Sequence, residues 1–472
     1  MLNKILSTLL ILSVLISING CKNAVENTEP QILTEANEEL SGGKEGTVFD
    51  ATFNAFGNSL INLNFEEVDK FVIGNSFNRN NWVIAPSSTA ARDGLGPFLN
   101  AASCASCHAL DGKGNPFQND GIGISQALLF RLSIPGQTAH GEPKDDPNYG
   151  GQFNPRSIPN VDVEGEVEVS YQEMAGKYPD GTSYSLRKPT YKFKNLSYGA
   201  MNGTMISPRI APHMVGMGLL DAVSEQTILA NTDLNDANGD GISGKANYVW
   251  DEINKKKSIG KLGWKANQPS VEQQTAAAFN GDIGITSKLF PNEGMTDFQQ
   301  KKYGSLPSGG KPEIDEATLQ NVVFYIKSLA VPARRNWKDE EILTGKTLFV
   351  KANCSGCHVP KMETGVYDSP KYLAKQTIRP YSDLLLHDMG EDLADNRPDF
   401  DATGSEWRTP PLWGLGLQKT VNKHTYMLHD GRARNVEEAI LWHGGEAEKS
   451  KNAYMKFTKE ERMKLLRFID SL

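Results

Sequence analysis

The sequence contains few cysteines, and their scarcity argues against a disulfide-stabilised scaffold. Only five of the 472 residues are cysteine, and four of these form two C-x-x-C pairs. A chain of this length can bury enough apolar surface to fold without cross-links. The paired cysteines therefore indicate a chemical role, and the fifth, Cys21, needs a separate explanation.

Positive charge is not in excess either. Lys and Arg number 49 against 57 Asp and Glu, which gives a net charge of −8 at pH 7. Proteins that bind nucleic acids need a concentrated basic surface to neutralise phosphates. We therefore expect no nucleic-acid partner.

The apolar run at the N-terminus is too short to cross a bilayer. It spans 14 residues, ILSTLLILSVLISI, behind one lysine, and polar sequence follows it. The pattern predicts a signal peptide over residues 1–20. Gly20-Cys21 resembles a bacterial lipoprotein cleavage site, although Asn19 is unusual there, so Cys21 is a lipidation candidate and simple secretion is the alternative. We expect a flexible tether over 21–45 and a periplasmic or cell-envelope protein, held to the outer membrane by its lipid.

Each remaining cysteine pair is followed directly by a histidine. In a C-x-x-C-H motif the two thiols reach the two vinyl groups of one porphyrin, and the histidine becomes the proximal iron ligand. A zinc site would leave both histidines unused, and a thioredoxin-like redox pair would need a preceding β-rich run that is missing. The sequence therefore predicts two covalent c-type haems, held by Cys104, Cys107 and His108 and by Cys354, Cys357 and His358.

Helical periodicity surrounds both motifs. Residues 46–130 open with the helical pattern GTVFDATFNAFGNSLINL and continue as loops, and residues 201–335 return to helix until Pro332. Between them, residues 131–200 alternate short apolar and polar runs with turns. This pattern predicts an insertion that carries a β-hairpin.

The last part of the chain is helical at both ends. KDEEILTGKTLFVKANCSGCH runs into the second motif as a helix, and Thr458 with Glu461 forms a capping box before the terminal amphipathic helix. We therefore expect a mainly α fold of two cytochrome c-like helical haem domains, 46–335 and 336–472. The small β-hairpin-bearing insertion, about 131–200, belongs to the first.

Three stretches of the C-terminal third carry a family resemblance: PYSDLLLHDMG, EWRTPPLWGLG and YMLHDGRARNVEEAILWHGGEA. They resemble the bacterial di-haem oxidoreductases, sometimes labelled thiol oxidoreductases, a family similar to the di-haem cytochrome c peroxidases. The thiol label has no support here, because no free cysteine remains after haem attachment and lipidation. The resemblance implies a peroxidase-like oxidoreductase. Electrons from a periplasmic cytochrome or cupredoxin would enter the C-terminal haem and pass to the N-terminal haem, which reduces a small oxidant such as hydrogen peroxide.

The resemblance also implies a second axial ligand for the C-terminal haem. The matching position is His443, where the peroxidases usually carry methionine, so this haem would have two histidine ligands and a lower reduction potential. Met455 is the nearest rival ligand. A plain core or surface histidine is the alternative reading of His443.

A third set of residues follows from GKLGWKANQPSVEQQTAAAFNGDIGIT, which resembles the peroxidase segment between the haems. Trp264 matches the bridging tryptophan, Gln274 the distal glutamine, and Asp282 stands where the peroxidases have glutamate. A carboxylate there moves the proton that peroxide cleavage requires, although aspartate is one methylene shorter. Core packing of Trp264 and a capping or turn role for Asp282 are the alternatives.

The distal side of the N-terminal haem has no clear ligand in the sequence. The stretch that matches the peroxidase loop is NLSYGAMNGTMISPRIAPHMVGMG, and we expect a five-coordinate or weakly ligated iron. The remaining histidines, His140, His387, His424 and His429, are interpreted as structural or surface residues, although His387 and His429 lie in family motifs and are candidate propionate partners. The candidate distal ligands are Tyr198, Met201, Met205, His213 and Met214.

The segment NDANGDGISGKAN resembles a calcium-binding loop. Asp236, Asn238 and Asp240 alternate before a glycine, and the carbonyl of Ile242 would be a fourth ligand. Asn247 stands at the position of the bidentate glutamate, which excludes a full EF-hand. A turn held by Asx hydrogen bonds is the alternative.

Two other functions remain open at this point. A pure electron-transfer cytochrome would have both irons six-coordinate and no substrate. A protein-modifying di-haem oxidase would need an exposed aromatic path from the second haem. What separates the peroxidase-like enzyme from the cytochrome is an open distal position on the N-terminal haem.

Overall fold

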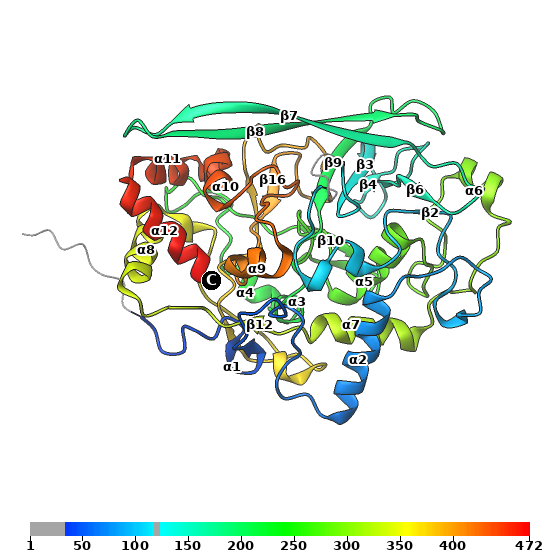
Figure 1. Ribbon diagram of the computed structural model, residues 1–472, viewed down its shortest axis with the longest axis horizontal. Helices are drawn as coiled ribbons and strands as arrows, with labels where there is room; N and C mark the ends of the chain where they lie inside the picture. Colours follow the sequence, from blue (N-terminus) through cyan, green and yellow to red (C-terminus); the bar gives the residue numbers. More distant parts are fainter. Residues whose placement is uncertain (1–33, 118–122) are drawn as a thin grey trace, which may run out of the picture. The chain divides into compact units, whose positions relative to one another are not determined.

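Short helices, short strands and long loops alternate along the chain in the computed structural model, which describes residues 34–117 and 123–472 (Figure 1). Helices account for 29% of the residues and strands for 20%. The prediction of a mainly α fold is therefore wrong. The 44 glycines and 24 prolines break the chain into segments too short for long helices, and many of these segments pair as small sheets.

Two helix pairs nevertheless frame the two C-x-x-C-H motifs. Helix α2 (Phe65–Arg79) packs against α7 (Glu316–Lys327), and α8 (Glu340–Lys351) packs against α12 (Lys459–Ser471). Each pair crosses at a glycine. A Cβ on Gly74 would lie 2.1 Å from the carbonyl oxygen of Asn321, and a Cβ on Gly345 would lie 2.1 Å from that of Lys464. The helical part of each predicted haem domain is thus present as one close-packed pair.

The helices around the second motif begin and end where the sequence predicts. Helix α8 runs into the turn at Cys354, and α12 begins behind Thr458, whose side chain accepts from the amide of Glu461 in a capping box. In the first half, α7 ends at Lys327, before Pro332. These predictions are confirmed.

The helix expected from residue 46 onward is wrong. Thr47–Val48 form strand β1, paired with β12 (Val331–Pro332), and turns follow until α2 begins at Phe65. Side chains of Asp50 and Asn58 bond nearby backbone or one another in this segment, which offers the backbone an alternative to helix.

The remaining helices are short. They are α1 (Gly43–Gly46), α3 (Met217–Asp221), α4 (Glu225–Leu229), α5 (Val271–Ala278), α6 (Asp297–Tyr303), α9 (Gln418–Asn422), α10 (Val436–Trp442) and α11 (Glu448–Lys456).

Most of the sheets have two strands. The pairs are β2 (Phe98–Leu99) with β6 (Arg156–Ser157), β10 (Tyr248–Asp251) with β11 (Lys256–Ile259), β13 (Met362–Glu363) with β14 (Thr377–Ile378), and β15 (Leu386–Asp388) with β16 (Glu406–Arg408). A four-stranded sheet is built on β3 (Leu128–Gln137), which pairs with β4 (Pro143–Lys144), β5 (Gln152–Phe153) and β9 (Met205–Ile210).

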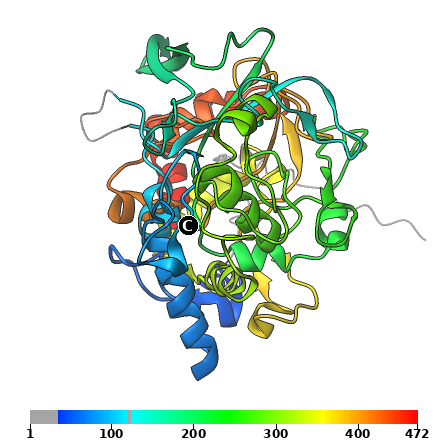
Figure 2. The ribbon, with the colours of Figure 1, turned by 90° about the vertical axis from the view of Figure 1, so that its right-hand side faces the viewer.

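The hairpin expected within residues 131–200 consists of β7 (Glu166–Lys177) and β8 (Ser183–Lys194), the longest strands described. It runs over the C-terminal helices along the upper edge of Figure 1, and Figures 1 and 2 place it opposite α2. Its tip is bound to the C-terminal part of the chain: Tyr178 donates to Glu437 at 2.7 Å, and Asp180 accepts from Arg462 at 2.8 Å. The hairpin of the insertion therefore connects the first half of the protein to the C-terminal part.

The end of the predicted tether is packed against the protein. Glu38 is 2% exposed and forms ion pairs with Arg334 and Lys346. The prediction of a flexible tether is therefore wrong for this part of 21–45. The predicted signal peptide and Cys21 lie outside the described residues.

The larger hydrophobic core joins both halves of the sequence. Phe56 and Val331 pack in the same cluster as Leu384 and Trp413. None of the helices in the described ranges is long and apolar enough to span a membrane.

Candidate haem sites

The first C-x-x-C-H motif folds as one turn of 3-10 helix, Cys104–Ser106. The amide of His108 donates to the carbonyl of Cys104 at 2.9 Å, which brings both thiols and the imidazole to one side of the turn. The Nδ1–H of His108 donates to the carbonyl of Pro212 at 2.8 Å. Burial lowers the pKa of this histidine. A neutral imidazole with a bare Nε2 is the form that binds iron.

The second motif repeats this arrangement 250 residues later. The turn is Cys354–Gly356, and the amide of His358 donates to the carbonyl of Cys354 at 3.0 Å. The Nδ1–H of His358 donates to the carbonyl of Tyr381 at 2.9 Å, and burial lowers its pKa to about 4. Backbone carbonyls from distant segments thus hold both candidate proximal ligands in the same tautomer.

All four cysteines of the motifs are free thiols. Burial raises the pKa of Cys104 and of Cys354 to about 12, so both are protonated at neutral pH. The pairs belong to two separate turns. Within residues 34–117 and 123–472, no group of three or more His, Cys, Asp or Glu side chains is placed to hold a metal ion.

The second motif opens into a cavity of about 240 Å³. Cys354, Cys357 and His358 line it, and so does His443, which ends helix α10. The Nδ1–H of His443 donates to the carbonyl of Ala439 at 2.7 Å, and its Nε2 makes no hydrogen bond within the described residues. Both histidines line one cavity, as the two axial ligands of a haem would. Met455 lies on α11 and does not line the cavity.

Trp264 lies between the cavity and the first motif. Its ring lines the cavity, and its Nε1–H donates to the carbonyl of Ile210 at 2.8 Å. Two residues further on, Pro212 accepts the hydrogen bond of His108. One short segment, 210–212, thus joins Trp264 to the proximal histidine of the other site.

Asp282 lies beside the first motif. It belongs to a π-helical turn, Phe279–Ile283, and its carbonyl accepts from the amides of Asn100 and Ala101 at 2.8 and 3.0 Å. Its carboxylate accepts from the Nε2 of Gln152 at 3.0 Å, and it caps no helix. Burial and then this carboxylate raise the pKa of the Cys104 and Cys107 thiols, which shows how close Asp282 comes to the haem-attachment turn.

Gln274 makes no hydrogen bond to the Asp282 carboxylate. It is half-buried on α5, and its side chain makes no hydrogen bond within the described part of the chain. Gln152 is the amide that bonds Asp282, and the sequence contains no signal for it because β5 is a two-residue strand of the insertion. Asn100 and Arg156 were also missed: Arg156 donates to the carbonyl of Asn100 at 2.9 Å and lies close to Cys107.

The distal candidates of the first site are separated by the fold. His213 and Met214 directly follow Pro212, which holds the proximal histidine, so both lie on the proximal side; His213 lines the cavity of the other site. The hydroxyl of Tyr198 donates to the carbonyl of Asp162 at 2.6 Å. Met201 packs against the β3 sheet and Met205 begins β9.

The histidines interpreted as structural have their own partners. His387 lies between Asp383 and Glu446, both at 2.8 Å, and neither ring nitrogen is left for a propionate. His424 bonds the carbonyl of Lys113 at 3.0 Å, and His140 stacks on Trp250. His429 stacks on Trp407 and lines the cavity, and its Nε2 bonds no described atom.

The calcium-like loop turns its oxygens toward its own backbone. Asp236, Asn238 and Asp240 accept from the amides of Gly241, Asp240 and Ile242 at 2.8 to 3.0 Å. The Nζ of Lys449 donates to the carbonyl of Asp240 at 2.9 Å. These are the Asx hydrogen bonds of the alternative reading, and calcium binding stays a prediction.

Two C-x-x-C-H turns with half-buried histidines, connected through Trp264 and the segment 210–212, are the arrangement expected of a di-haem protein. The family model described as "Di-haem oxidoreductase, putative peroxidase" matches residues 35–472. The chain therefore belongs to the di-haem oxidoreductase family, as the sequence motifs indicate. No curated protein and no solved structure matches it.

Proposed function

We propose that this protein is an exported, peroxidase-like di-haem oxidoreductase. Electrons enter at the C-terminal haem, pass by way of Trp264 to the N-terminal haem, and reduce hydrogen peroxide: one peroxide takes up two electrons and two protons and gives two waters. The observation that carries the proposal is the placement of Asp282 beside the first motif, while His443 lies opposite the second. One site thus has a proton-transfer group and the other a candidate sixth ligand.

Two c-type haems, bound covalently through the four motif cysteines, supply the redox chemistry. His108 and His358 are the proximal ligands, since each keeps Nε2 bare and fixes Nδ1 on a carbonyl. His443 would be the sixth ligand of a haem held by the second motif. This ligation would close the C-terminal haem to substrates and suit it to electron storage.

At the first haem, Asp282 is the acid and base. Peroxide cleavage requires a base that takes the proton from one oxygen and returns it to the other. Gln152 donates to the Asp282 carboxylate and fixes its direction, and the backbone bonds from Asn100 and Ala101 fix its turn. These contacts compensate for the shorter side chain relative to glutamate, because position decides the rate of proton transfer.

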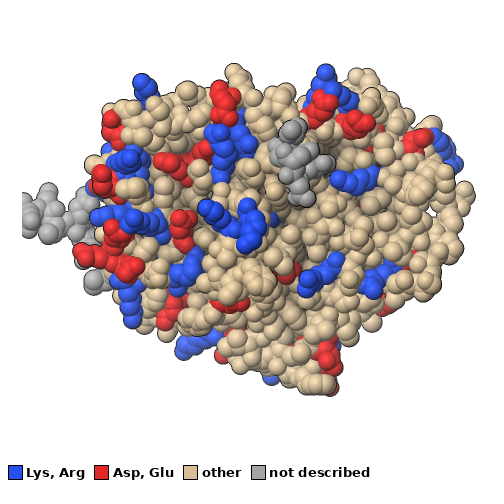
Figure 3. All heavy atoms as spheres, in the orientation of Figure 1, with Lys and Arg blue, Asp and Glu red and all other residues tan. Residues whose placement is uncertain are grey.

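The location follows from the same chemistry. C-type haem is attached outside the cytoplasm, and a lipid on Cys21 would hold the protein at the outer membrane, with a periplasmic cytochrome or cupredoxin as electron donor. On the face shown in Figure 3, acidic and basic side chains lie interspersed over the C-terminal helices. The 236–242 loop, which packs on the second motif through Asn353, would bind calcium there.

Spectroscopy of the purified protein tests the proposal. We expect one high-spin and one low-spin ferric haem by electron paramagnetic resonance, and conversion of the high-spin signal when peroxide is added to the half-reduced protein. Asp282→Asn slows peroxide turnover, whereas Gln274→Leu, a change on the neighbouring helix, has little effect. Two low-spin signals that peroxide never alters would establish an electron-transfer cytochrome instead.

A further inference from the structure

Two buried cations lie close to Trp264, and neither forms an ion pair with an acidic residue of the described chain. Lys113 and Arg408 are each 7% exposed, and both line the cavity of the second motif. The Nζ of Lys113 lies 5.4 Å from the Trp264 ring centre, and the amide of Arg408 donates to the Trp264 carbonyl at 2.9 Å. They come from distant parts of the sequence, and each contacts this tryptophan.

Lys113 has a fixed backbone and an unbound amine. Its amide donates to Asn422 at 3.2 Å and its carbonyl accepts from His424 at 3.0 Å, so residues of the C-terminal part position it. Its Nζ makes no hydrogen bond to residues 34–117 or 123–472. Burial lowers the pKa of this amine to about 7.

Two of the three nitrogens of the Arg408 guanidinium donate hydrogen bonds to described residues. Its Nε donates to the carbonyl of Gly263 at 2.7 Å and its Nη1 to that of Thr409 at 3.3 Å. Its Nη2 bonds no atom of the described residues. Two backbone carbonyls hold the guanidinium in place, and no carboxylate neutralises it.

Other buried cations nearby are paired, which makes these two exceptional. Lys265 bonds Asp395 at 2.8 Å, and Arg432 bonds Asp430 at 2.9 Å. Asp430 raises the pKa of Lys113, but it is already paired with Arg432. Asp383 likewise raises the pKa of Arg408, but it is already paired with His387.

The cavity wall contributes no compensating charge. Among the described residues that line it, none is Asp or Glu. An unpaired buried charge is costly, so an anion is expected to complete the site. A haem carries two propionates on one edge, which matches two cations on one wall.

We propose that Lys113 and Arg408 each bind one propionate of the C-terminal haem, at the part of the cavity wall that includes Trp264. The inference rests on haem binding at the second motif, as in the proposed function, but not on peroxide as the substrate. It orients the haem so that its propionate edge faces Trp264 and the first site. The two cations also stabilise the ferrous haem, because reduction adds a negative charge beside them.

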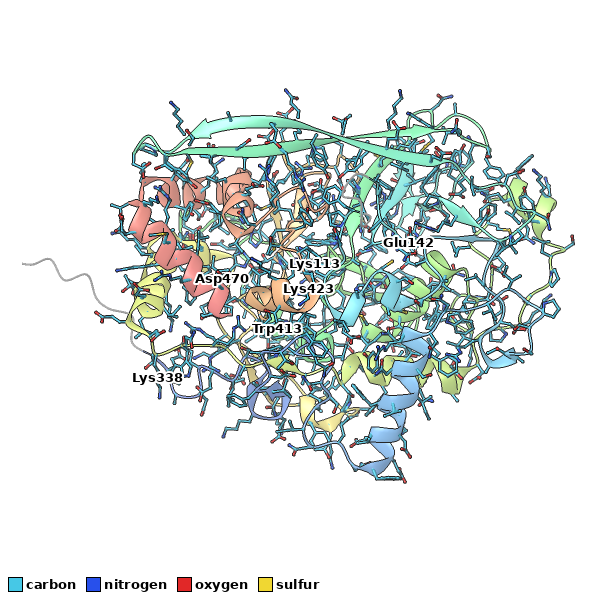
Figure 4. The ribbon with its side chains drawn as sticks, in the orientation of Figure 1. Lys113, Glu142, Lys338, Trp413, Lys423 and Asp470 are labelled. Carbon is cyan, nitrogen blue, oxygen red and sulfur yellow. The ribbon has the colours of Figure 1, made fainter. Side chains whose placement is uncertain are left out.

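A spectroscopic redox titration of the complete di-haem protein tests this without peroxide. Lys113→Met and Arg408→Met are each expected to lower the equilibrium constant for reduction of the low-spin C-terminal haem at least tenfold, which is about 59 mV for one electron. Lys113→Arg retains the charge and most of the potential. The matched control is Lys423→Met. This lysine is exposed, follows the residue that bonds Lys113, and is labelled close to it in Figure 4; its charge is screened by water.

Unchanged potentials in both Met variants, or a shift confined to the N-terminal haem, would overturn the assignment. If the Met variants fail to incorporate haem, the charge-retaining variants Lys113→Arg and Arg408→Lys are used to test the proposal. Both should shift the propionate bending bands of the C-terminal haem in resonance Raman spectra, and absence of a shift in both would refute the proposal. Normal potentials with no peroxide turnover would instead count against the proposed function alone.

Discussion

The two haem-attachment turns are nearly identical, but their surroundings differ. Both hold a proximal histidine on a distant backbone carbonyl, at 2.8 Å from Pro212 and 2.9 Å from Tyr381. The second turn shares a cavity of about 240 Å³ with His443, whereas the first has Asp282 and Gln152 beside it. In the function proposed above, the same local motif would serve electron storage in one place and chemistry in the other, and the surrounding fold would assign the roles.

The largest effect is expected when His443, the proposed sixth ligand of the C-terminal haem, is removed. His443→Ala should convert the C-terminal haem from low spin to high spin, because the substitution removes the imidazole that would be its sixth ligand. Optical and electron paramagnetic resonance spectra measure the change. Met455→Leu is the control, and a low-spin haem that survives His443→Ala but disappears in Met455→Leu would reverse the ligand assignment.

The second-largest effect is expected at the first site, where Asp282 is the proposed acid and base. Asp282→Asn should lower kcat/KM for peroxide roughly 100-fold, because an amide cannot accept and return the proton. Asp282→Glu should keep most of the activity. Steady-state peroxide assays with a reduced donor measure both variants, and equal activity of Asp282→Asn and the wild type would remove Asp282 from the mechanism.

A pH dependence is expected at the second site. Burial opposes ionisation of Glu446, but hydrogen bonds from His387 and Ser243 outweigh it and hold its pKa at about 2, below the ordinary 4.5. A lowered carboxylate pKa stabilises the folded state above pH 4.5, and this stabilisation is lost as the pH falls from 4.5 toward 2. Glu446→Gln should therefore cost about 2 kcal/mol at pH 7 and much less near pH 2.

Denaturant unfolding at the two pH values measures this difference. Glu448→Gln is the matched control, since Glu448 forms only an exposed ion pair with Lys451 at 4.0 Å. A cost for Glu446→Gln that is the same at both pH values would show that the charge of Glu446 is irrelevant.

The smallest effect is expected from a change at Trp264, which lies between the two sites. Trp264→Phe removes the hydrogen bond to Ile210 and should cost about 1 kcal/mol of folding free energy. It should also slow electron transfer between the haems, measured by flash reduction of the C-terminal haem. Trp413→Phe is the control: Trp413 lines the same cavity, and its Nε1 bonds no described atom. Equal transfer rates in both variants would leave Trp264 a packing residue.

The predictions that were right rest on local pattern. The capping box at Thr458 and the helices before Cys354 and Pro332 are short-range features, because spacing along the chain determines which groups meet. The mainly α fold failed for the opposite reason. Strands such as β5 and β12 are two residues long and form only where a partner from far along the chain supplies the hydrogen bonds.

The sequence by itself determined the family and the prediction of two haem-attachment motifs, since both rest on contiguous residues. Only the tertiary structure decided what surrounds each motif. It brought Gln152 from the insertion to Asp282, and it placed both Lys113 and Arg408 in contact with Trp264. These contacts join residues far apart along the chain, and no local spacing constrains them, so folding alone decides which of them form.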